Sequence, residues 1–154
     1  MKMALNFCSF LIACSFVFFM LPSCKTALII IRNSDTATGK LELRNAEGRP
    51  ADTVDVVPGE RIKWTIADGA NVDSIKAISE KDTSQNVLSR RAHSKHSSST
   101  WKAKVARKAQ LEKIAKPTKV EGKEYYYEEE YYIEWKDKSG NIHTYDPKIA
   151  VNPK

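Results

Sequence analysis

The sequence predicts a mainly β protein, a single antiparallel β-sandwich that follows an N-terminal signal segment. Three observations predict this fold class. Short runs in which apolar and polar residues alternate recur along the 154-residue chain. Turn-forming residues separate these runs at short spacing, and little of the chain has helical periodicity. Strands of this kind bury one face each, and two sheets packed face to face cover those faces.

Five candidate strands occupy the first half of the sandwich. The clearest is residues 61–66, in which apolar Ile62 and Trp64 alternate with charged side chains. A turn precedes this strand, because Pro58 restricts φ at one central position and Gly59 permits a positive φ at the next. The other candidates are residues 28–31, 40–44, 51–57 and 75–79.

The second half begins with a basic, Ser-rich stretch, residues 90–100, which predicts an exposed loop. Residues 101–105 then alternate as a strand, and for residues 106–116 both a strand and a short helix remain open, since Leu111, Ile114 and Ala115 would share a helical face. The remaining strands are predicted at residues 125–136, 141–145 and 149–151. Three tryptophans fall at inward positions of three strands and are expected to share one core: Trp64, Trp101 and Trp135.

The first residues of the chain are typical of a secretory signal. Residues 7–21 are apolar apart from two serines, and Lys2 is the only charged residue before Lys25. Pro22 ends the apolar run, and Ser23 is the kind of small residue that precedes a signal-peptidase cleavage site. The run is also shorter than the roughly 20 residues that a membrane-spanning helix needs. We therefore expect the segment to be cleaved.

Residues 21–24, Leu-Pro-Ser-Cys, resemble the lipobox of bacterial lipoprotein signals, in the looser form of Bacteroidota-type lipoproteins. The resemblance implies that Cys24 is acylated and that the chain is a small lipoprotein of the cell envelope. It would face the periplasm or the cell surface, on the outer membrane rather than the inner one. The domains expected on this basis are a signal peptide at residues 1–23, a short tether at 24–27 and the β-sandwich at 28–154.

Three alternatives to this assignment of the signal peptide and the localisation remain. Residues 11–14 fit the strict lipobox with Cys14 as the lipid-bearing residue, but they leave a shorter apolar run. The first residues can instead persist as an uncleaved membrane helix, or the protein can be soluble and secreted. The chain has three cysteines, all within its first 24 residues, so cleavage before Cys24 excludes an intrachain disulfide.

The stretch from Val57 to Trp64 resembles the V-x-P-G-x-x-V-x-W stretch of cupredoxin-like and some immunoglobulin-like sandwiches. The resemblance implies a Greek-key sandwich. In a cupredoxin it would also imply copper bound by two His, one Cys and a weak axial ligand. After cleavage the chain retains no Cys except Cys24 and no Met, so a blue-copper site is excluded. No cofactor is expected.

Catalytic and metal-binding patterns are weak in this sequence. His93 and His96 lie in the Ser-rich stretch and His143 is distant, so the three do not form the rigid ligand set that zinc needs. No G-x-S-x-G motif and no glycine-rich phosphate loop occurs. The carboxylates of residues 128–130 alternate between the faces of one strand. We expect them to pair with basic residues 90–123 or to face water, rather than to act on a glycosidic bond.

Residues 90–123, the basic segment, contain 11 Lys and Arg against two Glu. Trp101 lies within this segment, and cations beside an aromatic ring are typical of surfaces that bind polyanions. The candidate contacts are Arg90, Arg91, Lys95, Lys102, Lys104, Arg107 and Lys108. The opposing interpretation is a solvated strand face and loop whose charge keeps the protein soluble.

These patterns predict a non-catalytic binding or interaction module of the cell envelope, anchored through a lipid on Cys24. The expected partners are the membrane and an envelope protein or an anionic polymer, with no specific nucleic acid. One alternative function is the binding of a polyanion (anionic lipid, acidic polysaccharide or nucleic acid) through the basic segment. A second alternative is an enzyme whose site follows no known motif.

Overall fold

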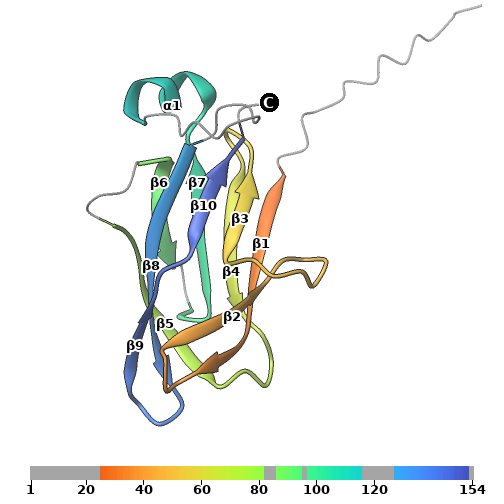
Figure 1. Cartoon of the computed structure of the whole chain (residues 1–154), viewed down its shortest axis with the longest axis vertical. Coiled ribbons are helices and arrows are strands. Elements are labelled where there is room, and N and C mark those ends of the chain that lie inside the picture. The colour runs from red at the N-terminus through yellow and green to blue at the C-terminus, as the bar shows by residue number, and fades with distance from the viewer. Residues whose placement is uncertain (1–24, 82–85, 95–96, 116–126, 153–154) are drawn as a thin grey trace, which may run out of the picture.

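The computed structural model describes residues 25–81, 86–94, 97–115 and 127–152 (Figure 1). These residues form ten strands and one short helix, and the strands make two mixed sheets. The protein is therefore mainly β, and its two sheets are consistent with a β-sandwich. The predicted signal peptide and Cys24 lie outside the described residues.

The first sheet has five strands in the order β2-β1-β4-β7-β6. They are β1 (Thr26–Asp35), β2 (Lys40–Arg44), β4 (Arg61–Ile66), β6 (Leu88–Ser94) and β7 (Thr100–Val105). Central strand β4 completely buries Ile62 and Trp64, which confirms the alternation that predicted it. The predicted turn before β4 is also present, with Gly59 at a φ of 83°.

The second sheet has the order β3-β10-β8-β5, and β9 also pairs with β8. Its strands are β3 (Thr53–Val56), β5 (Val72–Glu80), β8 (Tyr127–Asp137), β9 (Ile142–Tyr145) and β10 (Lys148–Val151). Strand β8 is the longest, and it buries Tyr131, Ile133 and Trp135 as predicted. Strand β5 pairs with one edge of β8, while β9 and β10 share the other edge.

Each sheet contains one parallel pair, so the expectation of a purely antiparallel sandwich is wrong. Strand β1 runs parallel to β4, and β3 runs parallel to β10. The strands of each pair are separated in the chain by other strands, so no hairpin sets their relative direction. Alternation marks the buried face of a strand, but it carries no information about the direction of a distant partner.

The prediction of an exposed loop at residues 90–100 is also wrong in part. Residues up to Ser94 belong to β6, an edge strand that pairs with β7. Most β6 side chains are exposed or half-buried, and the register with β7 shifts twice. A polar edge strand with an irregular register lacks the alternation by which strands are predicted, because only one of its faces and one of its edges are covered.

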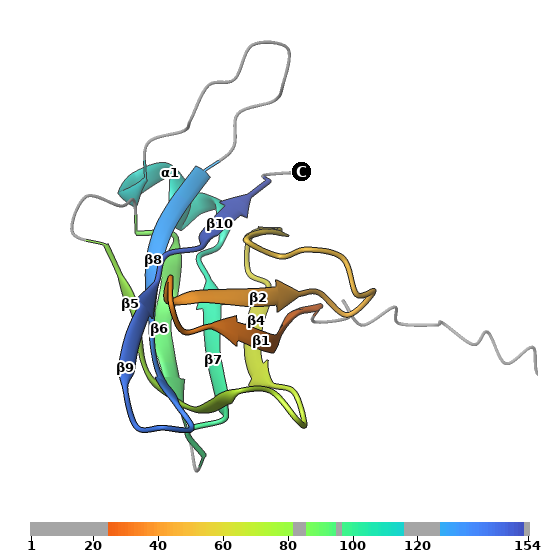
Figure 2. The same cartoon turned by 60° about the horizontal axis from the view of Figure 1, so that its bottom comes forward.

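Helix α1 (Lys108–Ile114) follows β7, so the short helix is the one that forms of the two alternatives left open for residues 106–116. Its Leu111 is completely buried, and the backbone N–H of Arg107 donates to Gln110 Oε1 at its start. Figures 1 and 2 show α1 at one end of the molecule and the turn between β8 and β9 near the opposite end. Within the described ranges no helix is long and apolar enough to cross a membrane.

One hydrophobic core joins residues from both sheets. Trp64 and Trp135 are completely buried, while Trp101 is half-buried and packs against the core. Trp101 is the β7 register partner of Trp64, so both side chains lie on the same face of the first sheet. The expectation that the three tryptophans share one core is confirmed, with Trp101 at its margin.

Candidate functional site

The outer face of the first sheet brings together basic side chains from neighbouring strands. On β4, Arg61 and Lys63 point away from the core, opposite to buried Trp64. On β7, Lys102 and Lys104 also point outward. The register places Arg61 opposite Lys104 and Lys63 opposite Lys102. Four cations thus form two cross-strand pairs of like charge.

Strand β6 widens this surface. Arg90 is the register partner of Lys104, and His93 is the register partner of Lys102. Neighbouring strands lie about 4.8 Å apart, so a row of three cations crosses β4, β7 and β6 within about 10 Å of backbone. We call the following five residues the basic face: Arg61, Lys63, Arg90, Lys102 and Lys104.

In the part of the chain that the structure describes, no acidic side chain neutralises the basic face. Among the described residues, none of its five members forms an ion pair. Like charges directly opposite one another on adjacent strands destabilise a sheet. A bound anion would remove this repulsion, because Lys and Arg donate strong hydrogen bonds to phosphate and carboxylate oxygens.

A hollow, the end groove, lies where the basic face meets α1. Its volume is about 490 Å³, and it is lined by Ser89, Arg90, Lys104, Arg107, Ala109 and Gln110. Arg90, Lys104 and Arg107 therefore meet in one concavity. A concave surface with three cations can surround an anionic group from several sides.

The start of β1 lies beside the same end of the sheet. Thr26 is the parallel register partner of Arg61, which in turn pairs with Lys104. The backbone N–H of Arg61 also donates to the carbonyl oxygen of Lys25 at 3.2 Å. An attachment at Cys24 would therefore hold this cationic end close to the point of attachment.

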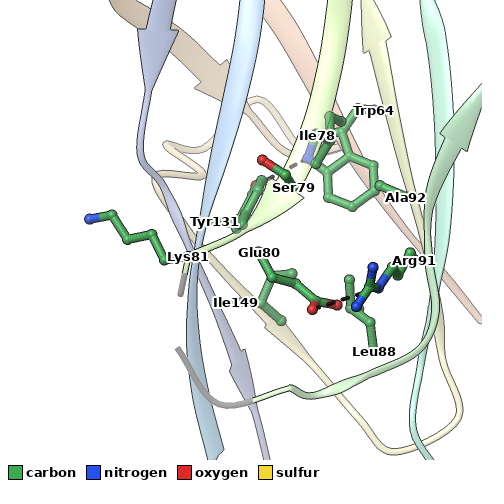
Figure 3. Close-up of a pocket in the computed structure, with 10 residues that line it drawn as sticks. All are labelled: Trp64, Ile78, Ser79, Glu80, Lys81, Leu88, Arg91, Ala92, Tyr131 and Ile149. Carbon is green, nitrogen blue, oxygen red and sulfur yellow. Dashed lines mark hydrogen bonds and ion pairs between the residues drawn. The ribbon is translucent and has the colours of Figure 1, made fainter. Parts of the chain in front are cut away.

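Four of the seven predicted contacts come together at the basic face and the end groove: Arg90, Lys102, Lys104 and Arg107. Lys108 begins α1 directly after Arg107. Lys95 and residues 116–123 lie outside the described residues. Arg91 does not join this surface, because its Nε lies 3.9 Å from Glu80 Oε2 at the opening between the sheets (Figure 3).

Two members of the basic face, Arg61 and Lys63, were missed by the sequence reasoning. They lie outside the basic segment and join it only because β4 pairs with β7. The alternation of residues 61–66 did mark both side chains as outward. Their proximity to Lys102 and Lys104 depends on the strand order, which alternation does not reveal.

A second hollow, the inter-sheet pocket, opens between the two sheets near β5 and β6 (Figure 3). Its volume is also about 490 Å³. Much of its wall is apolar or aromatic, and two charged side chains, Glu80 and Arg91, face each other across it. The residues that line it are Trp64, Ile78, Ser79, Glu80, Lys81, Leu88, Arg91, Ala92, Tyr131 and Ile149.

The two outward carboxylates of residues 128–130, Glu128 and Glu130, have partners that the sequence did not indicate. Glu128 accepts a hydrogen bond from Lys148 Nζ at 2.8 Å, and Glu130 accepts one from Lys81 Nζ at 2.8 Å. Neither lysine belongs to the basic segment, so the expected pairing with that segment is wrong. Lys148 lies on β10 and Lys81 directly follows β5, and these two strands lie on either side of β8.

Glu129 lies between these two carboxylates but points inward, so the expectation that it faces water is wrong as well. It is completely buried, and its Oε2 accepts a hydrogen bond from the backbone N–H of Val87 at 2.5 Å. Burial raises the pKa of Glu129 to about 8, and the charge of Glu80 adds to the rise, while the Val87 hydrogen bond opposes it.

The histidines of the described chain are dispersed. His143 on β9 stacks on Trp135, with ring centroids 4.4 Å apart, and its Nε2 lies 3.1 Å from Asp137 Oδ2. His93 lies on β6, and His96 is outside the described residues. Within the part of the chain that the structure describes, no three His, Cys, Asp or Glu side chains are grouped to hold a metal ion.

The chain matches no protein-family model, and no curated protein matches its sequence. Its function is therefore inferred from the chemistry of its own surface. The basic face provides positively charged hydrogen-bond donors in a fixed register, which is the chemistry of anion binding.

Proposed function

We propose that this protein is a non-catalytic binding module of the cell envelope, tethered by a lipid on Cys24, whose basic face binds a polyanion. The observation that carries the proposal is a set of five cations in register on three strands, without an acidic partner among the described residues. The ligand class is a polymer or surface that repeats phosphate or carboxylate groups.

Binding of this kind is driven by charge. Each Lys or Arg that contacts an anionic group releases counterions from the ligand, so affinity falls steeply as salt rises. The end groove adds a position where one anionic group meets Arg90, Lys104 and Arg107. The flat rows of β4 and β7 then bind the groups that follow along the polymer.

The proposed tether would orient the basic face relative to the membrane. Any tether between Cys24 and the sheet is short, because Thr26 already belongs to β1 beside Arg61. With a lipid on Cys24, the end of the basic face at Arg61 and Lys104 lies near the membrane surface. Anionic lipid headgroups attract basic residues there, and acidic polysaccharide of the envelope offers the same chemistry.

The finer fold assignment, an immunoglobulin-like or cupredoxin-like sandwich, is part of this proposal. It is supported by the turn at Pro58 and Gly59, which leads into the central strand β4 in the way that the resemblance implies. A Greek-key sandwich of this kind commonly serves as a scaffold for binding surfaces.

Heparin affinity measured against salt tests the basic face. A variant that changes Arg61, Lys63, Lys102 and Lys104 to Gln is expected to elute at clearly lower salt than the natural protein. The control variant has the same net charge and changes four lysines elsewhere to Gln: Lys40, Lys76, Lys136 and Lys138. It should elute close to the natural protein. Equal retention of the two variants would contradict the proposal.

Binding to lipid vesicles distinguishes the two possible sources of the anionic groups, which are the membrane surface and an acidic polysaccharide. The Cys24→Ala protein, which has no lipid of its own at that position, is sedimented with vesicles of phosphatidylglycerol or of phosphatidylcholine. Greater binding to the anionic vesicles identifies the membrane surface, whereas binding to heparin alone identifies an acidic polysaccharide. Loss of both interactions below physiological salt would rule out polyanion binding as the function.

A further inference from the structure

The inter-sheet pocket has the composition of a small-molecule site. Sites of this kind are concave, mostly apolar and supplied with a few polar groups. Here two aromatic side chains, Trp64 and Tyr131, and three aliphatic ones form the inner end of the pocket and are each at least nine-tenths buried, while polar side chains border its opening (Figure 3). The aliphatic residues are Ile78, Leu88 and Ile149. The volume of about 490 Å³ suits a ligand of drug size or smaller.

Glu80 is the incompletely satisfied polar group in this wall. Its Oε1 is buried and has no hydrogen-bond partner among the described residues. Its Oε2 lies 3.9 Å from Arg91 Nε, which is an ion pair but lies beyond hydrogen-bond range. A buried carboxylate oxygen without a hydrogen-bond donor is costly, so the pocket favours a ligand that donates to Oε1.

A second carboxylate lies close to the first. Glu129 is completely buried, and its Oε1 also lacks a hydrogen-bond partner within the described chain. It neighbours the pocket on two sides, because it is the register partner of Ile149 and bonds to Val87, the residue before Leu88. Because burial raises the pKa of Glu129 to about 8, this group is largely protonated at neutral pH, and Glu80 is the carboxylate that a cationic ligand would meet.

Neither cation that lines the pocket neutralises Glu80 fully. The Arg91 side chain is 83% exposed and reaches Glu80 only at its opening. Lys81 is directed away from the pocket (Figure 3), where it pairs with Glu130 and Asp146 at 2.8 and 2.9 Å. A ligand that brings its own positive charge would complement the pocket.

We propose that the inter-sheet pocket binds a small molecule that carries a primary ammonium group on an apolar body. The ammonium donates to Glu80 and takes the place of Arg91, and the body lies beside Ala92, outside the buried rings of Trp64 and Tyr131. This site is separate from the basic face, because Trp64 points inward from β4 while the basic face points outward.

Calorimetric titration of the purified full-length protein with three matched probes tests the proposal. The probes are 2-phenylethylamine, which is a cation at pH 7, the neutral 2-phenylethanol and zwitterionic phenylalanine. We expect the amine to bind at least tenfold more tightly than the alcohol. Equal affinity for the alcohol, preference for the zwitterion, or no heat from the amine at 10 mM would each overturn the proposal.

Variants locate the binding in the pocket. Glu80→Gln should weaken amine binding at least tenfold, whereas Glu134→Gln, on the outer face of β8, should leave it unchanged. Arg91→Gln should strengthen it severalfold, because the competing cation is removed. If the affinity of Glu80→Gln equals that of Glu134→Gln, the amine binds elsewhere and the proposal fails.

A second variant tests the pocket without altering a carboxylate. Ala92 lines the pocket and is only half-buried, so a larger side chain can be accommodated there. Ala92→Phe should occupy the space of the ligand body and abolish amine binding while circular dichroism shows the natural fold. Unchanged affinity in a folded Ala92→Phe protein would contradict the assignment of the site.

Discussion

The indole N–H of Trp64 donates a hydrogen bond to the hydroxyl of Tyr131, with an Nε1–Oη distance of 3.0 Å. The two rings also meet edge to face, with centroids 5.7 Å apart and an interplanar angle of 65°. Trp64 belongs to β4 of the first sheet and Tyr131 to β8 of the second, so this contact joins the two sheets through the core. It also forms one wall of the inter-sheet pocket.

Tyr131→Phe is expected to destabilise the protein by about 1–3 kcal/mol, because it leaves the buried indole N–H of Trp64 without an acceptor. Urea denaturation measures the change in the free energy of unfolding. Tyr132→Phe is the matched control, since Tyr132 lies on the opposite face of β8 and is 37% exposed. If the two substitutions cost the same, the hydrogen bond contributes nothing specific.

The stability of the protein should depend on the protonation of Glu129. Its pKa rises from 4.5 to about 8 on folding, so the folded state holds the proton more tightly than the unfolded state. The contribution of this group to the free energy of unfolding is complete below pH 4.5 and is lost as the pH rises through 8. The groups that face it are Glu80 from β5, the backbone N–H of Val87 and Tyr131 on its own strand, with Arg91 of β6 beyond Glu80.

Glu129→Gln removes this titration, so its stability relative to the natural protein should improve by a few kcal/mol between pH 5 and pH 9. Urea denaturation at pH 5, 7 and 9 measures the effect. Glu134→Gln, which lies on the outer face, should follow the natural pH profile. Parallel profiles for Glu129→Gln and the natural protein would show that Glu129 titrates alike in the folded and unfolded states.

Removing positive charge from the basic face should stabilise the folded protein and weaken its binding to polyanions. Lys102→Glu replaces a like-charge pair with Lys63 by an ion pair, and we expect a gain of about 0.5 kcal/mol in the free energy of unfolding at low salt. The same substitution should lower retention on heparin. In 1 M NaCl the stability gain should vanish, because salt screens exposed charges. A variant that loses stability at low salt would show that the two side chains do not repel each other.

Gly39 holds a close contact between the two sheets. Its φ is 71°, its carbonyl oxygen accepts the indole N–H of Trp135 at 3.2 Å, and an added Cβ would lie 3.3 Å from the carbonyl oxygen of Thr144. Gly39→Ala should therefore cost about 2 kcal/mol, against about 1 kcal/mol for Gly48→Ala, which has a similar φ but open space around it. Thermal or urea denaturation compares them, and equal costs would exclude a steric part at Gly39.

The lipid anchor is tested by labelling cells with a fatty acid that bears a reporter group. Cys24→Ala should abolish incorporation of the label and either release the protein or block its maturation, because the thiol is the predicted attachment point. Cys14→Ala should leave labelling and membrane association unchanged. A Cys24→Ala protein that is still acylated and membrane-bound would refute the assignment.

Much of the local structure could be predicted because it depends on neighbouring residues. The alternation in residues 61–66 predicts a strand with Trp64 buried, and the turn before it follows from Pro58 and Gly59. Side-chain period and turn geometry are properties of a few consecutive residues. The edge strand β6 was missed because its polar side chains and irregular register leave no such period.

The candidate sites depend on contacts between distant residues, and these were less predictable. The basic segment indicated Arg90, Lys102 and Lys104, but Arg61 joined them only when β4 was seen beside β7. Arg91 was grouped with Arg90 by sequence, yet neighbouring side chains of a strand point to opposite faces, and Arg91 of β6 lies near Glu80 at the pocket.

By itself the sequence determined the strand periodicity, most of the buried faces, the turns and the net charge of this protein. Only the tertiary structure decided that β1 and β4 run parallel, that Glu129 is buried beside Glu80, and that Trp64 meets Tyr131. The reason is physical. A strand exposes its preferred face through local geometry, whereas its neighbours are selected by the burial and hydrogen bonding of the whole chain, at the entropic cost of closing long loops.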